Sequence, residues 1–455
     1  MLMNSDQFLE RLRAYDVEVS TIIHVGAADG QWAAMAQDVF PDSRCHLIEA
    51  NPYWKPQLDQ LAATRPNVSF TMAAAGPVQG EARLKLTSNP RLGFISGQGY
   101  DSVIEISVPM VRLYDEVTAH NLQPPYLLRI DCNGFDHEII QGGQGLLMET
   151  SVLIAACYNI APDVERQFPS IIEYYEKFGF RMMDLIDPEF RPLDSVLWKF
   201  DALFLRWQHP HAKAHVFATP ELPFPSYAEL YTLVSMDHLD ALGRIANRGI
   251  EIGTIIDVGA ARGTWSVSAK PIFPQAHCHL IEAKTYWQEE LDTLTRERSD
   301  FTYTLAAAGA HEGETLFVNT ERPYGGWAAG GFTDGSETDM VENVRMITID
   351  NEIRRHDLKP PYLIKLDTHG TEREILAGAI QAMNNCHLLV VECYNWGVVG
   401  ERRFTSMIQY FETFGMKVVD VGDIMARPYD RALWSLDLCL VKAHRPECEN
   451  FAYAG

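Results

Sequence analysis

The stretch Thr254–Gly263 reads T-I-I-D-V-G-A-A-R-G and decides the fold class of the chain. Its first five residues are mostly apolar and predict a short buried strand. Gly259 and Gly263 then allow a tight turn, and a helix is expected to begin directly after it. A second strand follows and ends in an acid, Glu282. This order of strand, glycine turn, helix and acid-terminated strand is typical of a nucleotide-type cofactor site in an open α/β sheet.

The same pattern occurs near the start of the chain, where Thr21–Gly30 reads T-I-I-H-V-G-A-A-D-G and the next strand ends at Glu49. The two halves match without a gap over some sixty residues, shift register by three, and match again from the Pro-Pro-Tyr motifs onward. A repeat of this length predicts two copies of a whole domain. We therefore expect a first repeat at 1–208, a proline-rich linker at 209–226 and a second repeat at 227–455.

Composition narrows the class of protein. The 455 residues are 47% hydrophobic and 22% charged, which is ordinary for a globular protein of two domains. The sequence shows no apolar run of membrane-spanning length and no signal-peptide pattern, which predicts a cytoplasmic protein without a membrane span. The eight scattered cysteines favour buried thiols over disulfides or metal ligands. A net charge of −23 argues against nucleic acid as a partner.

Short apolar strands alternate with helical segments in both repeats. This alternation predicts α/β domains, each a mostly parallel sheet covered by helices, that is, two Rossmann-like domains. In the first repeat the expected strands are 21–25, 45–48, 68–75, 126–130, 152–157, 179–185 and 203–205, and the expected helices include 51–63, 115–121, 134–147 and 169–178.

The turn does not fit a dinucleotide site, because the third glycine of G-x-G-x-x-G is missing. D-V-G-A-x-x-G followed by a second-strand acid instead resembles the cofactor turn of S-adenosylmethionine-dependent methyltransferases. The chain resembles two copies of the FkbM methyltransferase family over nearly all of each domain. In the second repeat the motifs that carry the resemblance are D-V-G-A-A-R-G, F-P…H-L-I-E-A, K-L-D-T-H-G-T-E-R-E-I-L-A-G-A, V-E-C-Y-N-W and R-P…L-W…D, within residues 257–437.

The resemblance implies S-adenosylmethionine as the cofactor. We expect the glycines to admit its methionine portion, Asp257 to bind its ammonium group, and Glu282 to accept hydrogen bonds from both ribose hydroxyls. The alternatives without a cofactor are that the two glycines only form a tight turn and that Glu282 is a surface acid at a strand end. The expected cofactor-binding residues are Asp257, Gly259, Ala260, Gly263, Trp265, Glu282, Ala283 and Ala307 in the second repeat, and Gly26, Ala27, Gly30, Glu49 and Asp131 in the first.

Candidate catalytic residues follow the next buried strands. Asp367 and His369 come directly after the strand 362–366, and Glu392 ends the strand after it. Carboxyl ends of parallel strands face the ligand crevice, so these side chains are expected together. His369 or Asp367 can remove the proton of an alcohol acceptor, or Asp367 can orient His369. A divalent metal held by the three residues, or purely structural roles, are the alternatives.

The two repeats differ at these positions. Asp257, His369 and Glu392 correspond to His24, Asn133 and Ala156. The glycines, the second-strand acid and Asp367 have equivalents in the first repeat. We therefore expect the second repeat to be catalytic and the first to be impaired or specialised, with activity of both repeats on different acceptors as the alternative.

The resemblance also implies O-methylation of a hydroxyl on a sugar, a glycan or a natural product. The loop 321–332, which contains Tyr324 and Trp327, is expected either to lie over such an acceptor or to be a plain connection. The rival functions are a non-catalytic tandem pseudo-methyltransferase that binds cofactor or ligand, and a nicotinamide oxidoreductase. An intramolecular pseudo-dimer of the two domains is also expected from the duplication.

Overall fold

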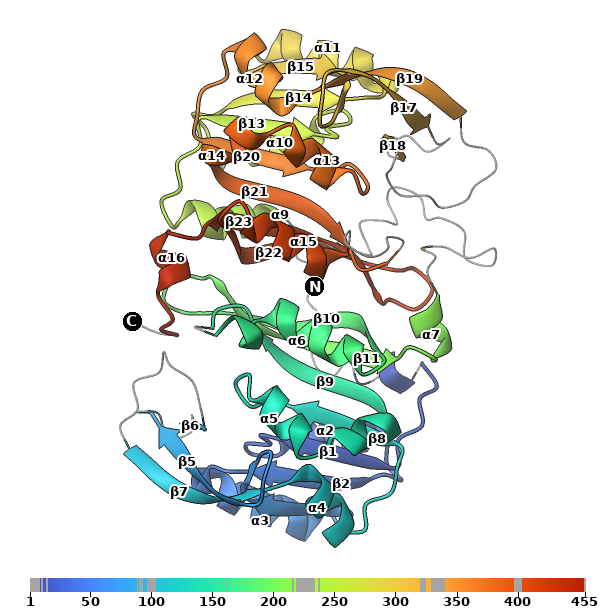
Figure 1. Ribbon diagram of the computed structural model, residues 1–455, viewed down its shortest axis with the longest axis vertical. Helices are drawn as coiled ribbons and strands as arrows, with labels where there is room; N and C mark the ends of the chain where they lie inside the picture. Colours follow the sequence, from blue (N-terminus) through green and yellow to red (C-terminus); the bar gives the residue numbers. More distant parts are fainter. Residues whose placement is uncertain are drawn as a thin grey trace. The chain divides into compact units, whose positions relative to one another are not determined.

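The computed structural model describes residues 9, 11–13, 15–87, 89, 93–95, 104–161, 163–214, 217, 234–235, 238–319, 325–328, 340–396 and 403–453. The chain divides into two compact units, and each contains one repeat (Figure 1). Unit 1 comprises Met1–Ala214 with Phe451–Gly455, and unit 2 comprises His215–Asn450. Most of the predicted linker lies outside the described residues, although a short helix, α7 (Pro210–Lys213), occupies its beginning.

A seven-stranded sheet forms the centre of unit 1, in the order β10-β11-β9-β8-β1-β2-β3. The five strands from β9 to β3 run parallel, whereas β11 is antiparallel to both of its neighbours. Every residue of β1 is buried, as expected for a parallel strand covered on both faces. The strands are β1 (Thr21–Val25), β2 (Arg44–Glu49), β3 (Val68–Met72), β8 (Tyr126–Ile130), β9 (Thr150–Tyr158), β10 (Phe180–Phe190) and β11 (Leu197–Arg206).

Unit 2 repeats this sheet in the order β22-β23-β21-β20-β13-β14-β15 and adds one short strand, β12, beside β22. The directions match those of unit 1, with β23 antiparallel to both neighbours. The strands are β12 (Val234–Ser235), β13 (Thr254–Val258), β14 (His277–Glu282), β15 (Phe301–Leu305), β20 (Tyr362–Leu366), β21 (Cys386–Tyr394), β22 (Met416–Ala426) and β23 (Leu433–Lys442).

Helices cover both faces of each sheet, and neighbouring residues of β2 show this. Leu47 points toward Gly30 and Leu58, on the face of α2 and α3. His46, one position earlier, points to the opposite face and meets Glu116 of α4. Besides α7, the helices of unit 1 among the described residues include α2 (Gln31–Val39), α3 (Lys55–Thr64), α4 (Leu113–Ala119), α5 (Asp136–Gln141) and α6 (Phe168–Lys177).

The helices of unit 2 are α9 (His238–Ala246), α10 (Thr264–Ala269), α11 (Gln288–Glu297), α12 (Ile349–His356), α13 (Glu372–Ala377), α14 (Ile380–Asn384), α15 (Phe404–Glu412) and α16 (Pro446–Glu449). The prediction of two α/β domains, each with a mostly parallel sheet covered by helices, is confirmed.

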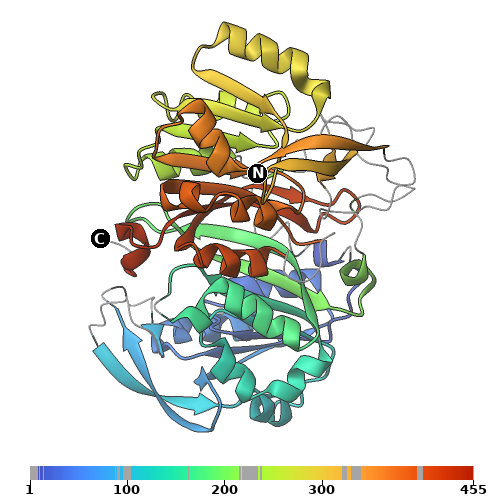
Figure 2. The same ribbon diagram turned by 45° about the horizontal axis from the view of Figure 1, so that its top comes forward.

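Each unit also contains a small four-stranded sheet. The prediction of the third strand was wrong in extent, because its last residues belong to this small sheet. The predicted strand 68–75 breaks after Met72, because Ala74 and Ala75 pair with Met110 and Val111 in the small sheet instead. In unit 1, the long antiparallel strands β5 and β7 of the small sheet project from the main sheet in both views (Figures 1 and 2). The small sheets contain β4 (Ala74–Ala75), β5 (Gly80–Leu86), β6 (Gly93–Phe94) and β7 (Ile104–Val111), and β16 (Ala307–Ala308), β17 (Gly313–Asn319), β18 (Gly326–Ala328) and β19 (Met340–Ile347).

The predicted helix 134–147 is also wrong in extent. The structure has α5 followed by a 3-10 helix, η2 (Gln144–Glu149). Gly142 interrupts the helix, since a Cβ there would lie 2.1 Å from the carbonyl oxygen of Gly76. The backbone therefore packs directly against the end of β4. The predicted strand 203–205 is in fact the much longer β11.

Segments that follow each repeat contribute an aromatic ring to a sheet. In unit 1, Tyr453 packs edge-on against Trp198, with ring centroids 5.3 Å apart. In unit 2, Phe217 packs in the same way against Trp434, with centroids 5.1 Å apart. Trp198 and Trp434 are equivalent residues of the two repeats, so each unit has the same aromatic contact.

Among the described helices, none combines the length and the apolar character needed to cross a bilayer. All eight cysteines carry free thiols, and six of them are buried.

Candidate active site

The turn after β13 is packed tightly against the end of β20. Gly259 and Gly263 have left-handed backbones, with φ of 79° and 80°. A Cβ on Gly259 would lie 2.0 Å from the carbonyl oxygen of Asp367, and one on Gly263 would lie 2.7 Å from a Leu294 methyl group. Both glycines are therefore required by the fold itself. A contact between these glycines and a donor remains a prediction.

Glu282 clamps this turn from the end of β14. Its Oε2 accepts a hydrogen bond from the Ala261 amide at 2.7 Å, and its Oε1 accepts one from the Lys284 amide at 2.7 Å. The side chain is buried, so it is not a surface acid. Burial raises the pKa of Glu282, and the two amide hydrogen bonds oppose that rise. Each oxygen retains a second lone pair for another donor.

Asp257 lies fully buried at the end of β13. Its Oδ2 accepts a hydrogen bond from Ser266 Oγ at 2.7 Å, and its Oδ1 lies 3.9 Å from Lys365 Nζ. Oδ1 has no hydrogen-bond partner among the described residues. Burial raises the pKa of Asp257, while Lys365 and Ser266 lower it. An acceptor atom beside the glycine turn is thus left without a hydrogen-bond donor among the described residues, which is uncommon for a buried polar group.

Lys365 was not among the residues predicted for the site. Its buried ammonium group donates a hydrogen bond to Asp367 Oδ2 at 2.8 Å and contacts the Trp265 ring at 5.2 Å from the centroid. Although burial opposes the shift, Lys365 lowers the pKa of Asp367 to about 2. Asp437 on β23 is a further buried carboxyl group whose pKa burial raises well above its usual value. The sequence signal was the alternation along β20, which places Lys365 and Asp367 on one face.

The structure brings the three predicted catalytic residues together. One potential ligand atom from each of Asp367, His369 and Glu392 lies within 4.8 Å of the other two. His369 occupies a left-handed backbone position, with φ of 56°. Burial and the charge of Asp367 raise the pKa of Glu392.

Tyr394 links two of these residues and was also missed. Its hydroxyl donates a hydrogen bond to Glu392 Oε2, and His369 Nδ1 lies 2.7 Å from the same hydroxyl oxygen. The hydroxyl has one hydrogen, so His369 Nδ1–H donates to Tyr394 in this arrangement. Ser435 Oγ holds the other carboxylate oxygen of Glu392 at 3.1 Å. The result is an ordered chain from Ser435 through Glu392 and Tyr394 to His369.

The remaining predicted residues of the second repeat lie around the turn. Ala260 is buried in the turn, Ala283 is half-buried after Glu282, and Ala307 is buried in β16. Trp265 stacks with His238, with centroids 5.5 Å apart.

The first repeat keeps the geometry of the turn. Gly26 and Gly30 have φ of 76° and 78°, and Ala27 is buried between them. Glu49 clamps the turn as Glu282 does, accepting hydrogen bonds from the Ala28 amide at 2.7 Å and the Asn51 amide at 2.6 Å. The difference between the repeats therefore lies in the side chains beside the turn.

His24 stands in the first repeat where the second repeat has the Asp257 carboxylate. Its ring is buried, and neither nitrogen has a hydrogen-bond partner among the described residues. Burial, with Arg129 nearby, lowers the pKa of His24 well below its usual value, so the ring is neutral at pH 7. Arg129 replaces Lys365 and lies over Trp32, with its guanidinium carbon 4.5 Å from the ring centroid.

A second cation lies at the same end of the first sheet. Lys199 Nζ is 3.5 Å from Asp131 Oδ2 and 4.0 Å from Glu189 Oε2. Arg129 pairs with Asp201 at 2.8 Å. Two cations thus face three carboxyl groups, Asp131, Asp201 and Glu189, at the strand ends, whereas in the second repeat three carboxyl groups, Asp257, Asp367 and Asp437, face the single cation Lys365.

No curated protein matches the chain. Among solved structures, it is similar to precorrin-6y C5,15-methyltransferase from Geobacter metallireducens, at 12% identity over 44% of this chain and 86% of that one, with a TM-score of 0.26. It is also similar to the fibrillarin pre-rRNA processing protein from Methanococcus jannaschii, at 13% identity over 57% of this chain and 84% of that one, with a TM-score of 0.29.

A comparison with protein families gives a match over most of the chain. The methyltransferase FkbM domain matches twice, at residues 24–182 and 257–418. The two segments contain both glycine turns, Gly26–Gly30 and Gly259–Gly263, and all three candidate catalytic residues of the second repeat. They confirm the predicted tandem duplication. The chain belongs to the FkbM family of methyltransferases and contains two copies of its domain.

Proposed function

We propose that the second repeat carries out S-adenosylmethionine-dependent methylation of an acceptor hydroxyl. The observation that supports this most directly is the set of buried carboxyl groups beside its cofactor turn. When bound, S-adenosylmethionine supplies an electrophilic methyl group on a positively charged sulfonium. Three carboxyl groups, Asp257, Asp367 and Asp437, around the single ammonium of Lys365 favour a cationic ligand at this end of the sheet.

The residues of the second repeat fit such a donor. Asp257 Oδ1 is a buried acceptor without a hydrogen-bond partner among the described residues, and it suits the ammonium group of a methionine moiety. Glu282 is already held by two backbone amides, and its remaining lone pairs are available to ribose hydroxyls. The donor would lie against the turn Gly259–Gly263.

We assign the role of general base to His369. In the chain described above, Nδ1–H donates to Tyr394, so Nε2 is the nitrogen that takes up a proton when the ring is neutral. Tyr394 and Glu392 fix this tautomer and stabilise the imidazolium that forms when Nε2 takes the acceptor's proton. Asp367 is a poor base by comparison, because its pKa of about 2 keeps it ionised with little affinity for a proton.

The alternative, a divalent metal held by Asp367, His369 and Glu392, is less well supported. Lys365 Nζ lies 2.8 Å from Asp367 Oδ2 and already neutralises that carboxylate. A metal at the cluster would have to displace this ammonium or accept its repulsion. General-base catalysis requires no such rearrangement.

The first repeat does not fit the donor. The carboxylate of Asp257 is replaced by the neutral His24, and Lys199 adds a second cation beside Arg129, the counterpart of Lys365. We propose that this repeat is impaired in donor binding and acts as a scaffold or substrate-holding domain.

For the acceptor, the family resemblance favours a hydroxyl of a sugar, a glycan or a natural product. The loop 321–332 gives less support than its sequence suggested. Trp327 is buried within β18, where it pairs with Val318 of β17, so it is not presented to an acceptor. Tyr324 lies outside the described residues.

Donor binding by paired variants tests the proposal. S-Adenosylhomocysteine binding, followed by calorimetry, is expected at one site per chain and to fall at least tenfold in Asp257→Asn and Glu282→Gln. The matched variant Glu49→Gln should bind as the wild type does. Equal losses for Glu49→Gln and Glu282→Gln would contradict the assignment to the second repeat.

Methyl transfer tests the base separately. His369→Gln should still bind S-adenosylhomocysteine but should lose methyl transfer to a hydroxyl acceptor. Its residual rate of methyl transfer should rise with pH, because bulk hydroxide then replaces the base. If His369→Gln methylates at the wild-type rate, His369 is not the base.

A further inference from the structure

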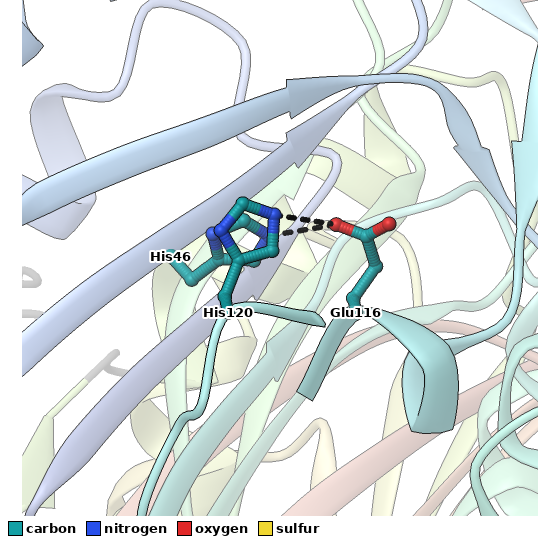
Figure 3. Close-up of side chains that lie close together, drawn as sticks. All are labelled: His46, Glu116 and His120. Atoms are coloured by element: carbon teal, nitrogen blue, oxygen red, sulfur yellow. Dashed lines mark hydrogen bonds and ion pairs between the residues drawn. The ribbon is translucent and has the colours of Figure 1, made fainter. Parts of the chain in front are cut away.

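A cluster of two histidines and one glutamate occurs in both repeats, away from the candidate active site. In the first repeat it consists of His46, Glu116 and His120 (Figure 3). In the second it consists of His279, Glu352 and His356. In each, the ligand atoms lie within 4.8 Å of one another. The equivalent positions thus hold identical residues, although the catalytic positions of the two repeats have diverged.

The cluster lies on the face of the sheet opposite the cofactor turn. His46 and Glu49 are three residues apart on β2, so their side chains leave opposite faces. Glu49 faces the turn, whereas His46 faces α4. Glu116 on α4 and His120 at its end are one helical turn apart, so both can reach the strand histidine. Figure 3 shows both imidazole rings directed at the same carboxylate oxygen.

The spacing of the atoms suits one small cation. In the first repeat Glu116 Oε2 lies 3.0 Å from His46 Nε2 and 3.5 Å from His120 Nε2. In the second, Glu352 Oε2 lies 3.5 Å from His279 Nε2 and 3.2 Å from His356 Nε2. Tetrahedral zinc with bonds of about 2.0–2.1 Å places its ligand atoms about 3.3 Å apart.

In both strand histidines a hydroxyl oxygen lies beside Nδ1, the ring nitrogen that faces away from the carboxylate, and it can accept Nδ1–H when Nε2 binds a metal. Ser69 Oγ donates weakly to the Cys45 carbonyl at 3.4 Å, so it can accept from His46 Nδ1–H at 2.9 Å. In the second repeat His279 Nδ1 lies 2.9 Å from Thr302 Oγ1. A hydroxyl that accepts from the other ring nitrogen is the usual support of a metal-binding histidine.

In the second repeat a buried ring nitrogen of the cluster has no hydrogen-bond partner among the described residues. His279 is buried, and its Nε2 has no hydrogen-bond partner among the described residues although it is directed at Glu352. A buried ring nitrogen that is directed at a carboxylate without a hydrogen bond is uncommon, and a cation between the two groups would be coordinated by both.

We propose that each His-Glu-His cluster binds one zinc ion, so that the chain holds two. The ion joins a central strand to the helix that covers it, β2 to α4 in unit 1 and β14 to α12 in unit 2. His120 and His356 are about one third exposed, which leaves the fourth position open to water. A zinc ion bound by three residues of a strand and the helix that covers it would link the two elements and stabilise the folded unit.

Zinc stoichiometry tests the proposal on the full chain, without a polyhistidine tag. The protein is stripped with a chelator, dialysed and titrated with Zn²⁺ against a chromophoric competitor. Two equivalents are expected for the wild type, one for Glu116→Gln and for Glu352→Gln, and none for the double variant. Glutamine keeps the volume of glutamate but removes its charge. One equivalent or fewer in the wild type would overturn the proposal.

Two control variants separate this site from its neighbours. His277→Gln removes a histidine that shares Thr302 with His279 but lies outside the cluster, at 2.8 Å from the same hydroxyl. His369→Gln removes the histidine of the candidate active site. Both should retain two equivalents, and loss of zinc in His369→Gln would place the metal at the active site instead.

A second measurement does not depend on the variants folding. Zn²⁺ should raise the thermal unfolding temperature of the stripped wild-type protein, and a chelator should reverse the rise. Substitution by Co²⁺ should give the visible absorption of a tetrahedral site. If zinc neither binds nor shifts unfolding, the clusters are hydrogen-bonded networks with a proton in place of the metal.

Discussion

Asp136, at the start of α5, illustrates how a single buried carboxyl group sets a pH dependence. Burial raises its pKa to about 7, although a hydrogen bond from Tyr175 Oη at 2.7 Å opposes the rise. Its folded-state pKa lies above its unfolded-state value, so the folded protein holds more protons between these values. The stability from this group is therefore complete below pH 4 and is lost as pH rises to about 7.

Asp136→Asn should remove this dependence. The free energy of unfolding of the wild type contains a contribution from Asp136 that falls between pH 4.5 and pH 7.5, and the variant lacks this fall. The difference in free energy of unfolding, variant minus wild type, should therefore be about 3–4 kcal/mol larger at pH 7.5 than at pH 4.5. Urea unfolding at the two pH values measures it. Asp59→Asn, at a side chain that is 54% exposed, is the control and should differ little from the wild type. Parallel pH curves for Asp136→Asn and the wild type would show that Asp136 is ionised at neutral pH.

Single residues also show what the sequence could reveal of the site. Asp367, His369 and Glu392 were predicted together, because each follows or ends a strand whose carboxyl end is fixed by the fold. Tyr394 was within reach of the same reasoning, since it lies two residues after Glu392 on one face of β21. Asp437 was not, because its place beside Glu392 depends on the antiparallel pairing of β21 with β23.

At the scale of elements, the turn between β13 and α10 packs its backbone directly against the end of β20. Gly259→Ala is expected to lower the free energy of unfolding by about 2–5 kcal/mol, because it adds a backbone clash with Asp367 to the strain of a left-handed residue. Gly249→Ala is the matched control: its φ is 75°, but a Cβ there meets nothing within 4 Å. It should cost only about 1–2 kcal/mol.

Urea unfolding of the two glycine variants gives the comparison. Similar losses would mean that the turn can move away from β20 at little cost. Donor binding should fall in Gly259→Ala and stay unchanged in Gly249→Ala, since only the first alters the turn.

Elements differed in how well their sequence predicted them. The central strands were predicted closely, because parallel strands covered on both faces are continuous apolar runs. The third strand was drawn too long, since the apolar run 68–75 continues through the point where the chain leaves one sheet for another. The helix 134–147 was drawn too long because its apolar spacing gave no sign that Gly142 packs against Gly76.

At the scale of the whole molecule, the duplication predicts two units with different responses to the donor. S-Adenosylhomocysteine at about 100 times its Kd should stabilise the unit that binds it by about 2.7 kcal/mol. That corresponds to about 5–11 °C for a unit of this size. Calorimetry should show the shift in one transition only, which Asp136→Asn can assign because it alters unit 1. Two shifted transitions would mean that both repeats bind the donor.

The placement of residues 451–453 has a consequence for how the chain is made. Tyr453 donates a hydrogen bond to Glu189, 264 positions earlier, and the Ala452 carbonyl accepts one from Arg191. During synthesis, the ribosome therefore releases these two partners of Glu189 and Arg191, Tyr453 and Ala452, only after the entire second repeat has been translated. Unit 1 leaves the ribosome first, but its packing is completed last. It requires residues 451–453, which follow the second repeat in the sequence.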